Sequence, residues 1–424
     1  MERTLEDWLA YIDRQNPRSI ELGLERVDAV AERLGLVAPA ERSIVVGGTN
    51  GKGSTVAFLE AIARASGLRT ATYTSPHLLR YNERVRIDGR DAEDAQLVAA
   101  FEAVEAARGD TPLTYFEYGT LAALWLFDRE RLDLAILEVG LGGRLDAVNI
   151  VDADVAVITT VDLDHQDWLG DDRERIGTEK AGIARAWKPL VIGDDDPPSS
   201  VLGHAYRIGA SAVRANCDFF FEANDDGATW RWRELNHDIE LPLPALAAPV
   251  QLRNAAVAIA ALRALDLPIT HAALAEGIAS AHVAGRLQRF ERDGVEVLVD
   301  VGHNPQAARA IAEWMQRTPA SGRTFAVYAA LGDKDVAGVV GALADRIDAW
   351  FLAGLAEAGP RGTTVDAFAE RLRDTAAGKG ARHATVADAL TEARAQAKPG
   401  DRVLVLGSFF TVASAMAALG SEAG

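Results

Sequence analysis

Short apolar runs alternate with longer stretches of helical periodicity along most of this chain. The apolar runs predict strands over residues 43–47, 70–74, 133–139 and 155–160. Amphipathic stretches between them predict helices over residues 54–65 and 115–129. Because parallel neighbours need a crossover connection, strands that alternate with helices indicate an α/β fold with a wound, mostly parallel sheet.

A β-rich stretch from about Val213 to Leu241 breaks this rhythm and predicts a small antiparallel element at the edge of the first domain. A Pro-rich segment and an Ala-rich helix over residues 250–264 follow it. Beyond a connector at His282–Arg286 the rhythm restarts, with strands predicted over residues 295–301, 324–330, 349–353 and 402–406. Since domains usually have about 100–200 residues, we expect two of them, at 1–284 and 285–424.

Acidic residues outnumber basic ones, because 62 Asp and Glu against 44 Lys and Arg leave a formal charge of -18. This excess argues against a protein that coats nucleic acid or lies on an anionic membrane. No apolar run reaches the roughly 18 residues of a membrane span, and residues 1–8 do not predict a secretion signal. The single cysteine, Cys217, allows no intramolecular disulfide. We therefore expect a cytoplasmic protein.

The sharpest local motif is a Gly-rich loop with a lysine, which reads VVGGTNGKGST over residues 45–55. It lies between a predicted buried strand and a predicted helix. Glycines allow backbone N–H groups to converge on phosphate oxygens, and the helix N-terminus adds its positive dipole end. Lys52 is expected to reach the β- and γ-phosphates, with the hydroxyls of Ser54 and Thr55 beside them.

The motif departs from the strict G-x-x-x-x-G-K-[ST] pattern. Val46 stands where the first glycine is required, and Gly53 follows the lysine. An ordinary Gly-rich turn between strand and helix therefore remains the alternative, although the order of strand, loop, lysine and helix favours nucleotide binding.

Gly48-Thr-Asn-Gly-Lys-Gly-Ser54 resembles the phosphate loop of the Mur-ligase superfamily, and more closely that of folylpolyglutamate synthases. Further matching segments follow in the same order along the chain: residues 20–26, 74–78, 114–117, 137–149, 162–165, 179–182, 285–286, 300–305, 331–335 and 407–408. The likeness covers nearly the whole chain and is closest to the bacterial bifunctional dihydrofolate synthase/folylpolyglutamate synthases.

The resemblance implies a two-domain Mur-ligase-like α/β fold. Its N-terminal part would be a P-loop ATPase domain with a wound, mostly parallel sheet and a small β element, and it would bind ATP and folate. A smaller, Rossmann-like α/β domain would form the C-terminal glutamate-ligase part. Mur-type ligases that use a UDP-sugar have a whole domain before the ATP loop, whereas only 47 residues precede Gly48 here. We therefore expect a two-domain ligase.

The activity implied by this resemblance is ATP-dependent amide formation. A substrate carboxylate attacks the γ-phosphate to give an acyl phosphate, and the amine of L-glutamate then displaces phosphate. The implied small-molecule partners are ATP, L-glutamate, dihydropteroate and reduced folates. Mg²⁺ is the implied cofactor, with K⁺ or another monovalent cation as an additional candidate. Because each motif occurs once, a monomer is expected.

The resemblance also assigns residues to each part of the site. ATP is assigned to Gly48, Thr49, Asn50, Gly51, Lys52, Gly53, Ser54, Asn254, Arg286, Asp300 and, more weakly, His303, with Asn304 beside it. The metal is assigned to Ser75, Glu138 and His165. Lys180 matches a lysine that is carbamylated to N6-carboxylysine, and it is expected to act in catalysis with Lys52 and His165. The pterin and folate segments are Glu21, Leu22, Gly23, Leu24, Thr114, Tyr115, Phe116, Glu117, Leu145, Asp146 and Ala147.

Asp146 is expected to accept the adjacent N–H donors of a pterin, and Phe116 to stack on its ring. Asp300 is expected to meet a ribose hydroxyl. Each residue also has an ordinary structural alternative: Glu138 as an acid at the edge of the core, His165 as a structural histidine, Lys180 as a solvated helix lysine, and Asn254 as a helix N-cap.

Two positions depart from the family pattern. The family usually has Pro-Gly-Arg where this chain has Ala284-Gly-Arg286, and the bifunctional enzymes often have Asp where this chain has Glu21. The presence of the Glu21 segment nevertheless favours the bifunctional enzyme, with a monofunctional folylpolyglutamate synthase as the alternative. A nucleotide-switched binding protein is a third hypothesis, against which the metal set and the folate-like segments argue. All the proposed substrates are anions, so Lys52, Arg286, a helix N-terminus and Mg²⁺ must form a local positive site within an acidic protein.

Overall fold

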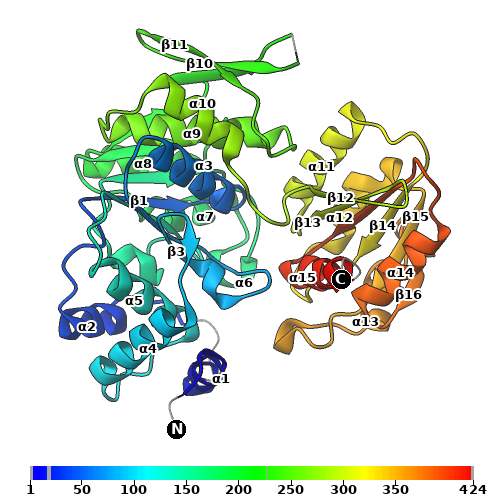
Figure 1. Cartoon of the computed structure of the whole chain (residues 1–424), viewed down its shortest axis with the longest axis horizontal. Coiled ribbons are helices and arrows are strands. Elements are labelled where there is room, and N and C mark those ends of the chain that lie inside the picture. The colour runs from blue at the N-terminus through cyan, green and yellow to red at the C-terminus, as the bar shows by residue number, and fades with distance from the viewer. Residues whose placement is uncertain (1–2, 17–20, 226, 422–424) are drawn as a thin grey trace. The chain divides into compact units, whose positions relative to one another are not determined.

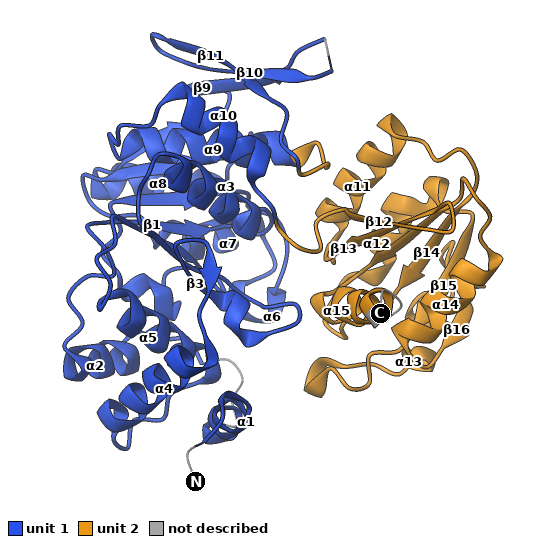
Figure 2. Cartoon of the chain, in the orientation of Figure 1, with its two compact units in different colours: residues 1–245, 251–282 blue, residues 246–250, 283–424 orange. Residues whose placement is uncertain are grey.

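The structure is a computed structural model that describes residues 3–16, 21–225 and 227–421. Met1 and Glu2 of the N-terminal segment, and Ile20 of the family-like segment 20–26, lie outside the described residues. The chain divides into two compact units, one of residues 1–245 and 251–282, the other of residues 246–250 and 283–424 (Figure 2). The main division therefore falls between residues 282 and 283, and residues 246–250 also pack with the second unit.

The first unit is built on an eight-stranded sheet with strand order β4-β3-β2-β5-β1-β6-β7-β8 (Figure 1). Its strands are β1 Arg42–Gly47, β2 Thr70–Tyr73, β3 Val85–Ile87, β4 Arg90–Asp91, β5 Leu134–Glu138, β6 Val155–Ile158, β7 Pro189–Ile192 and β8 Ser211–Arg214. The six strands β2, β5, β1, β6, β7 and β8 run parallel to one another. At the other end of the sheet β3 pairs antiparallel with β2, and β4 pairs antiparallel with β3. The expectation of a wound, mostly parallel sheet is confirmed.

Helices surround this sheet (Figure 1). They are α1 Leu5–Gln15, α2 Glu25–Leu34, α3 Lys52–Ala65, α4 Asp94–Arg108, α5 Tyr115–Phe127, α6 Gln166–Leu169, α7 Arg173–Ala181, α8 Ser199–Ile208, α9 Val250–Ala264 and α10 His271–Ser280, with the 3₁₀ turns η1 Tyr81–Arg84 and η2 Ala147–Ile150. Helix α3 begins two residues earlier than predicted, because Gly51 is its N-cap and has a left-handed backbone.

The predicted antiparallel element is present, but its predicted start at Val213 is wrong. Val213 belongs to β8, which pairs in parallel with β7 as the edge strand of the main sheet. The chain then turns, and β9 Phe219–Ala223, β10 Thr229–Glu234 and β11 His237–Pro242 form a separate three-stranded sheet. Trp232 of β10 is fully buried and its indole Nε1 donates to the Ala256 carbonyl at 3.2 Å, which fixes this sheet on α9.

The second unit has a six-stranded sheet with order β12-β13-β17-β14-β15-β16. Its elements are β12 Gln288–Arg292, β13 Val295–Asp300, α11 Pro305–Arg317, β14 Thr324–Tyr328, α12 Val336–Leu343, η3 Ala344–Arg346, β15 Ala349–Ala353, η4 Gly359–Arg361, α13 Val365–Arg371, β16 Ala381–His383, α14 Val386–Gln396, β17 Arg402–Leu406 and α15 Phe409–Ser421. We expected Asp300 to end the first strand of this unit, but β12 precedes it and Asp300 ends the second strand, β13. Strand β12 has no apolar run, because it is an edge strand with polar residues at alternating exposed positions.

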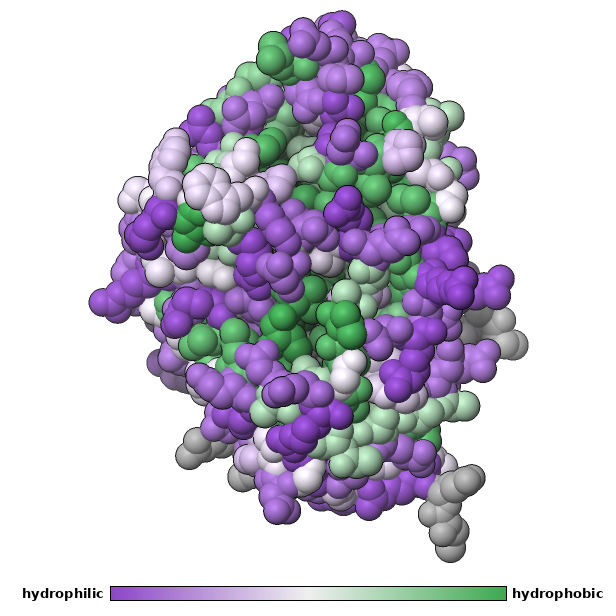
Figure 3. All heavy atoms as spheres, turned by 90° about the vertical axis from the view of Figure 1, so that its left-hand side faces the viewer, coloured by the Kyte–Doolittle hydropathy of each residue, from purple (hydrophilic) through white to green (hydrophobic). Residues whose placement is uncertain are grey.

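None of the described helices is long and apolar enough to cross a membrane. On the face shown in Figure 3, hydrophilic residues predominate and the hydrophobic ones lie in groups between them.

Candidate active site

The phosphate loop is held in shape by the strand next to it. The backbone N–H of Thr49 donates to the Thr160 carbonyl at 2.8 Å, and that of Asn50 donates to the Thr160 hydroxyl at 3.1 Å. The Thr159 hydroxyl donates to the Asn50 carbonyl at 2.6 Å. Since β1 and β6 are parallel neighbours, their carboxyl ends meet at one edge of the sheet, where wound sheets bind ligands.

Two glycines in this loop are required by close contacts. Gly48 has φ +145°, and a Cβ there would overlap the Thr159 hydroxyl. Gly51 has φ +87°, and a Cβ there would lie 2.6 Å from Asn254 Oδ1. The structure therefore brings Asn254 against the phosphate loop. Asn254 lies inside α9, which begins at Val250, so the N-cap alternative for this residue is wrong.

Lys52 opens α3 and folds back over the loop. Its Nζ donates to the carbonyls of Gly48 at 3.0 Å and Thr49 at 3.2 Å. Ser54 and Thr55 follow in the first turn and are almost fully buried. The Thr55 hydroxyl has no hydrogen-bond partner among the residues described. A lysine ammonium, backbone N–H groups and hydroxyls thus gather at a helix N-terminus, which suits an anion such as a triphosphate.

Ser75 and Glu138, two of the predicted metal ligands, are in contact. The backbone N–H of Ser75 donates to Glu138 Oε2 at 3.1 Å. Glu138 ends β5, is buried, and faces the first turn of α3, since a Cβ on Gly53 would lie 3.8 Å from its Oε2. Its position next to the phosphate loop favours the ligand assignment over that of an isolated acid at the edge of the core.

His165, the third predicted metal ligand, lies on the loop after β6 and is the N-cap of α6, with φ +51°. The same loop is tied to the phosphate loop, because the Thr49 hydroxyl donates to the Asp162 carbonyl at 3.0 Å. His165 Nε2 lies 3.9 Å from Asp164 Oδ2.

Among the described residues, no group of three or more His, Cys, Asp and Glu side chains is arranged to hold a metal ion. The predicted set contains only two side chains of those types. One carboxylate, one hydroxyl and one imidazole fit a divalent ion that takes its remaining ligands from water and phosphate, as Mg²⁺ does.

Lys180 is buried in the last turn of α7, so the solvated-lysine alternative is wrong. Burial lowers its pKa to about 7, and the neighbouring Lys52 acts in the same direction, whereas Asp164 and Asp146 oppose the shift. A large neutral fraction at neutral pH is what carbamylation requires, because only the unprotonated amine reacts with CO₂. Helix α7 also packs tightly on the loop after β5, since a Cβ on Gly143 would lie 2.8 Å from the Glu179 carbonyl.

The three predicted pterin and folate segments lie together. The backbone N–H of Gly23 donates to the Leu145 carbonyl at 3.3 Å. Arg26 pairs through Nη1 with Glu21 at 3.1 Å and through Nη2 with Glu117 at 2.8 Å. Segment 21–24 is thus linked to both segment 145–147 and segment 114–117.

Within segment 114–117, two residues begin helix α5 as a capping box. The Glu117 backbone N–H donates to the Thr114 hydroxyl at 3.2 Å, and the Thr114 N–H donates to Glu117 Oε2 at 2.7 Å. Phe116 lies over Gly140, where a Cβ would come within 2.6 Å of the ring. The partly buried Tyr115 and Phe116 are therefore the side chains of this segment that remain accessible to a ligand.

Asp146 is buried and is the N-cap of η2. Its Oδ2 accepts the Leu141 N–H at 2.8 Å and its Oδ1 accepts the Val148 N–H at 3.1 Å. Burial raises its pKa to about 7, although these backbone hydrogen bonds and the Lys52 charge lower it. Both carboxylate oxygens therefore already accept backbone hydrogen bonds, which reduces the acceptor capacity that Asp146 has for a pterin N–H.

Arg286, Asp300 and His303 belong to the second unit. Asp300 Oδ2 accepts the Leu287 N–H at 2.8 Å and its Oδ1 accepts the Gly302 N–H at 2.7 Å. Burial raises the pKa of Asp300, and the charge of Arg286 opposes the shift. Nδ1 of His303 lies 3.0 Å from the Val301 carbonyl. These contacts gather the three residues at the carboxyl end of β13.

Asn304, placed beside His303 in the sequence, has a structural role. It is the N-cap of α11, and its Oδ1 accepts the Ala307 N–H at 2.9 Å.

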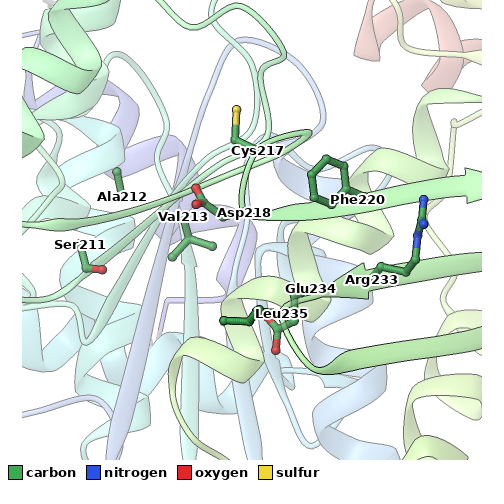
Figure 4. Close-up of a pocket in the computed structure, with 9 residues that line it drawn as sticks. All are labelled: Ser211, Ala212, Val213, Cys217, Asp218, Phe220, Arg233, Glu234 and Leu235. Carbon is green, nitrogen blue, oxygen red and sulfur yellow. The ribbon is translucent and has the colours of Figure 1, made fainter.

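A separate hollow of about 840 Å³ lies beside the edge strand β8 of the first unit's sheet (Figure 4). It contains none of the predicted site residues and is lined by Ser211, Ala212, Val213, Cys217, Asp218, Phe220, Arg233, Glu234 and Leu235.

Sequence reasoning missed the residues that join separate segments. Thr159 and Thr160 hold the phosphate loop, and Arg26 joins two pterin segments. A pair of threonines at a strand end was a usable signal, but it needed the strand order that places β6 beside β1. Arg26 ends the family-like segment 20–26, but its contact could not be predicted from the sequence, because its partner Glu117 lies 91 residues away.

Two family descriptions match the chain. Residues 46–262 match the Mur ligase middle domain, and residues 285–409 match the Mur ligase glutamate ligase domain. The fold and the phosphate loop are those of a Mur ligase.

Individual relatives narrow this class. The dihydrofolate synthase/folylpolyglutamate synthase of Escherichia coli is 47% identical over 97% of this chain and 94% of its own length. The structure of E. coli FolC in complex with DHPP and ADP matches with a TM-score of 0.94 at 46% identity, and covers 100% of this chain and 99% of that one.

A bifunctional folylpolyglutamate synthase/dihydrofolate synthase with Mn, AMPPNP and L-glutamate bound matches with a TM-score of 0.91 at 45% identity, covering 99% of this chain and 98% of that one. The chain therefore belongs to the dihydrofolate synthase/folylpolyglutamate synthase family of Mur ligases.

Proposed function

We propose that this protein is an ATP-dependent ligase that adds L-glutamate to dihydropteroate, forming dihydrofolate, and adds further glutamates to reduced folates. One observation carries this proposal. The loop after β5 follows directly on Glu138, beside the phosphate loop, and continues to Leu145 and Asp146, beside the pterin segments. The single loop of residues 139–146 therefore joins the phosphate loop to the pterin and folate segments, which together form the pteroyl side of the first unit.

The reaction has two steps. An oxygen of the substrate carboxylate attacks the γ-phosphorus, and the bond from that phosphorus to the oxygen of ADP breaks. The amine of L-glutamate, after losing a proton, then attacks the acyl carbon, and inorganic phosphate leaves. Because both steps need alignment and neutralised charge, the protein contributes mainly positioning and electrostatics.

In this scheme Lys52 moves from the loop carbonyls to the phosphate oxygens and neutralises charge there. Residues 48–54 hold the phosphates through their backbone N–H groups, and Asn254 contacts the nucleotide. Arg286, Asp300 and His303 supply further nucleotide contacts from the second unit.

Ser75, Glu138 and His165 would hold a divalent cation, which would supply charge neutralisation at the phosphates. Lys180, as a carbamate, would add a negative group next to this set. Mg²⁺ is the expected ion in the cell, and a relative is known with Mn bound. Binding of K⁺ and a monomeric state remain predictions.

Two E. coli matches favour the bifunctional enzyme. One relative is named a dihydrofolate synthase/folylpolyglutamate synthase, and the matching FolC structure contains DHPP and ADP. The ion pair of Glu21 with Arg26 adds support, since it ties the segment that departs from the family's usual Asp to the rest of the pterin site.

A phosphate-release assay with purified protein, ATP, Mg²⁺ and L-glutamate tests the proposal. Release on addition of dihydropteroate and, separately, of tetrahydrofolate supports both activities. Release with tetrahydrofolate only would point to the monofunctional enzyme. Tight ATP binding without release in either case would point to a nucleotide switch.

A further inference from the structure

Arg84 lies between Ser75, one of the proposed metal ligands, and the pterin segment 114–117 of the first unit. It ends η1, and its carbonyl accepts the backbone N–H of Thr74 at 2.9 Å, directly before Ser75. Its guanidinium carbon lies 5.6 Å from the ring centre of Tyr115, which opens the pterin segment 114–117.

The guanidinium is held in place by neutral groups. Arg84 Cζ lies 5.3 Å from the centre of the buried Tyr81 ring, so the group sits against two tyrosine faces. Its Nε donates to Nδ1 of His77 at 2.9 Å. Because Arg84 can only donate, His77 accepts at Nδ1 and carries its ring proton on Nε2, which is then a further donor.

Within the described part of the chain, no carboxylate forms an ion pair with Arg84. The arginines on either side of it do have such partners, since Arg80 pairs with Asp94 at 2.9 Å and Arg86 with Glu60 at 2.9 Å. The adjacent Glu83 is already engaged, because its carboxylate accepts the backbone N–H groups of residues 78–80 at 2.7–2.8 Å. Arg84 is thus a partly buried, oriented cation whose Nη groups remain available for a ligand.

A planar guanidinium held in this way suits a carboxylate, which it can bind with two parallel hydrogen bonds. The two proposed substrates differ in their carboxylates. Dihydropteroate has one, and that one must react with ATP. A folate that ends in glutamate has two, and only the γ-carboxylate reacts when the chain is extended through it. The α-carboxylate then needs a cationic partner in a protein with a net charge of -18.

We propose that Arg84, assisted by His77 Nε2, binds the non-reacting α-carboxylate of the terminal glutamate of folate substrates. This inference rests on the proposed function and adds a specificity-determining residue to it. Arg84 would serve the elongation reaction and contribute little to the reaction with dihydropteroate.

The test compares KM for tetrahydrofolate and for dihydropteroate in the full-length protein and in Arg84→Gln. We expect KM for tetrahydrofolate to rise about 10- to 100-fold, as for loss of a charge-assisted hydrogen bond, and KM for dihydropteroate to change less than about 3-fold. The matched control is Arg80→Gln, which removes the same charge from the same loop, and it should leave both values near those of the wild type.

A substrate analogue sharpens the test. Tetrahydropteroyl-4-aminobutyrate keeps the reacting carboxylate and lacks the α-carboxylate. The wild type should bind it more weakly than tetrahydrofolate by a similar factor, and Arg84→Gln should not distinguish the two. A merely structural role for Arg84 would not produce this loss of discrimination.

Several results would overturn the inference: an equal rise in KM for both natural substrates, unchanged values, or discrimination against the analogue that survives in Arg84→Gln. If the variant does not fold, Arg84→Lys replaces it and should give a smaller rise for tetrahydrofolate alone. A wild type inactive with both substrates would instead refute the proposed function itself, and the inference with it.

Discussion

The phosphate loop and the pteroyl side of the first unit are constructed in different ways. Lys52 contacts the carbonyls of Gly48 and Thr49, four and three residues away, and glycine backbones fix the loop. On the pteroyl side, by contrast, Arg26 pairs with Glu117 across 91 residues of sequence.

The two regions are therefore expected to serve different tasks, the phosphate loop in catalysis and the pteroyl side in the choice of substrate. The phosphate loop depends on backbone geometry and one lysine, so a change there should affect turnover with any carboxylate substrate. The pteroyl side depends on paired charged side chains, of which Glu117 is buried, so a change there should affect both stability and the choice of substrate.

The largest effect is expected for Lys52→Ala. Loss of the ammonium should reduce turnover by about 10³-fold or more with both substrates, because charge at the phosphates is no longer neutralised. The fold should remain intact, since Nζ donates to backbone carbonyls of the loop and Lys52 is not part of a hydrophobic core. Lys188→Ala is a suitable control. Lys188 directly precedes β7, so it lies at the amino ends of the parallel strands, away from the phosphate loop at their carboxyl ends. A folded Lys52→Ala protein with a normal rate would refute the role of this loop.

Gly48→Ala should come next. Its Cβ would overlap the Thr159 hydroxyl at a φ of +145°, so the unfolding free energy should fall by at least about 2 kcal/mol and ATP affinity should fall with it. Gly67→Ala is the matched control, because Gly67 also has a positive φ, +82°, but nothing lies within 4 Å of the added Cβ. Urea unfolding measures both, and equal losses would show that the contact with Thr159 does not matter.

Arg26→Met tests the pteroyl side. It leaves the buried Glu117 without its cation, and should lower the unfolding free energy by about 1–3 kcal/mol. KM for pteroyl substrates should rise while KM for ATP stays unchanged. The double variant Arg26→Met/Glu117→Gln removes both charges and should recover part of the stability. An equal rise in both KM values would show that the two regions are not separable.

A smaller effect is expected from pH through Lys180. Its pKa is lowered to about 7 in the folded protein from an ordinary value of 10.5, so the unfolded chain binds more protons between these values. Stability from this group should therefore rise with pH from about 7 to 10.5. In CO₂-free buffer the wild type should show this slope and Lys180→Met should lack it. Identical slopes in the two proteins would contradict the burial of a titrating amine at this position.

Much of the fold could be predicted from the sequence because its signals are local. The helix at 250–264 and the strands at 349–353 and 402–406 have the predicted bounds, since apolar runs and helical periodicity act over neighbouring residues. The edge strand β12 was missed, because half of its residues face away from the core and no apolar run marks it.

The site divides in the same way. The phosphate loop could be predicted from its glycines and lysine. The contacts of Thr159, Arg26 and Arg84 could not, because each depends on which distant segments the strand order places together. The family resemblance supplied candidate positions but not the hydrogen bonds that already occupy Asp146 and Glu117.

Transfer of ¹⁸O from substrate to phosphate tests the central claim most directly. Dihydropteroate labelled in its carboxylate oxygens is incubated with the protein, ATP, Mg²⁺ and L-glutamate, and the released phosphate is examined by mass spectrometry. If the carboxylate is activated as an acyl phosphate, each phosphate released with dihydrofolate carries one labelled oxygen from the substrate. Formation of dihydrofolate with unlabelled phosphate would contradict the account.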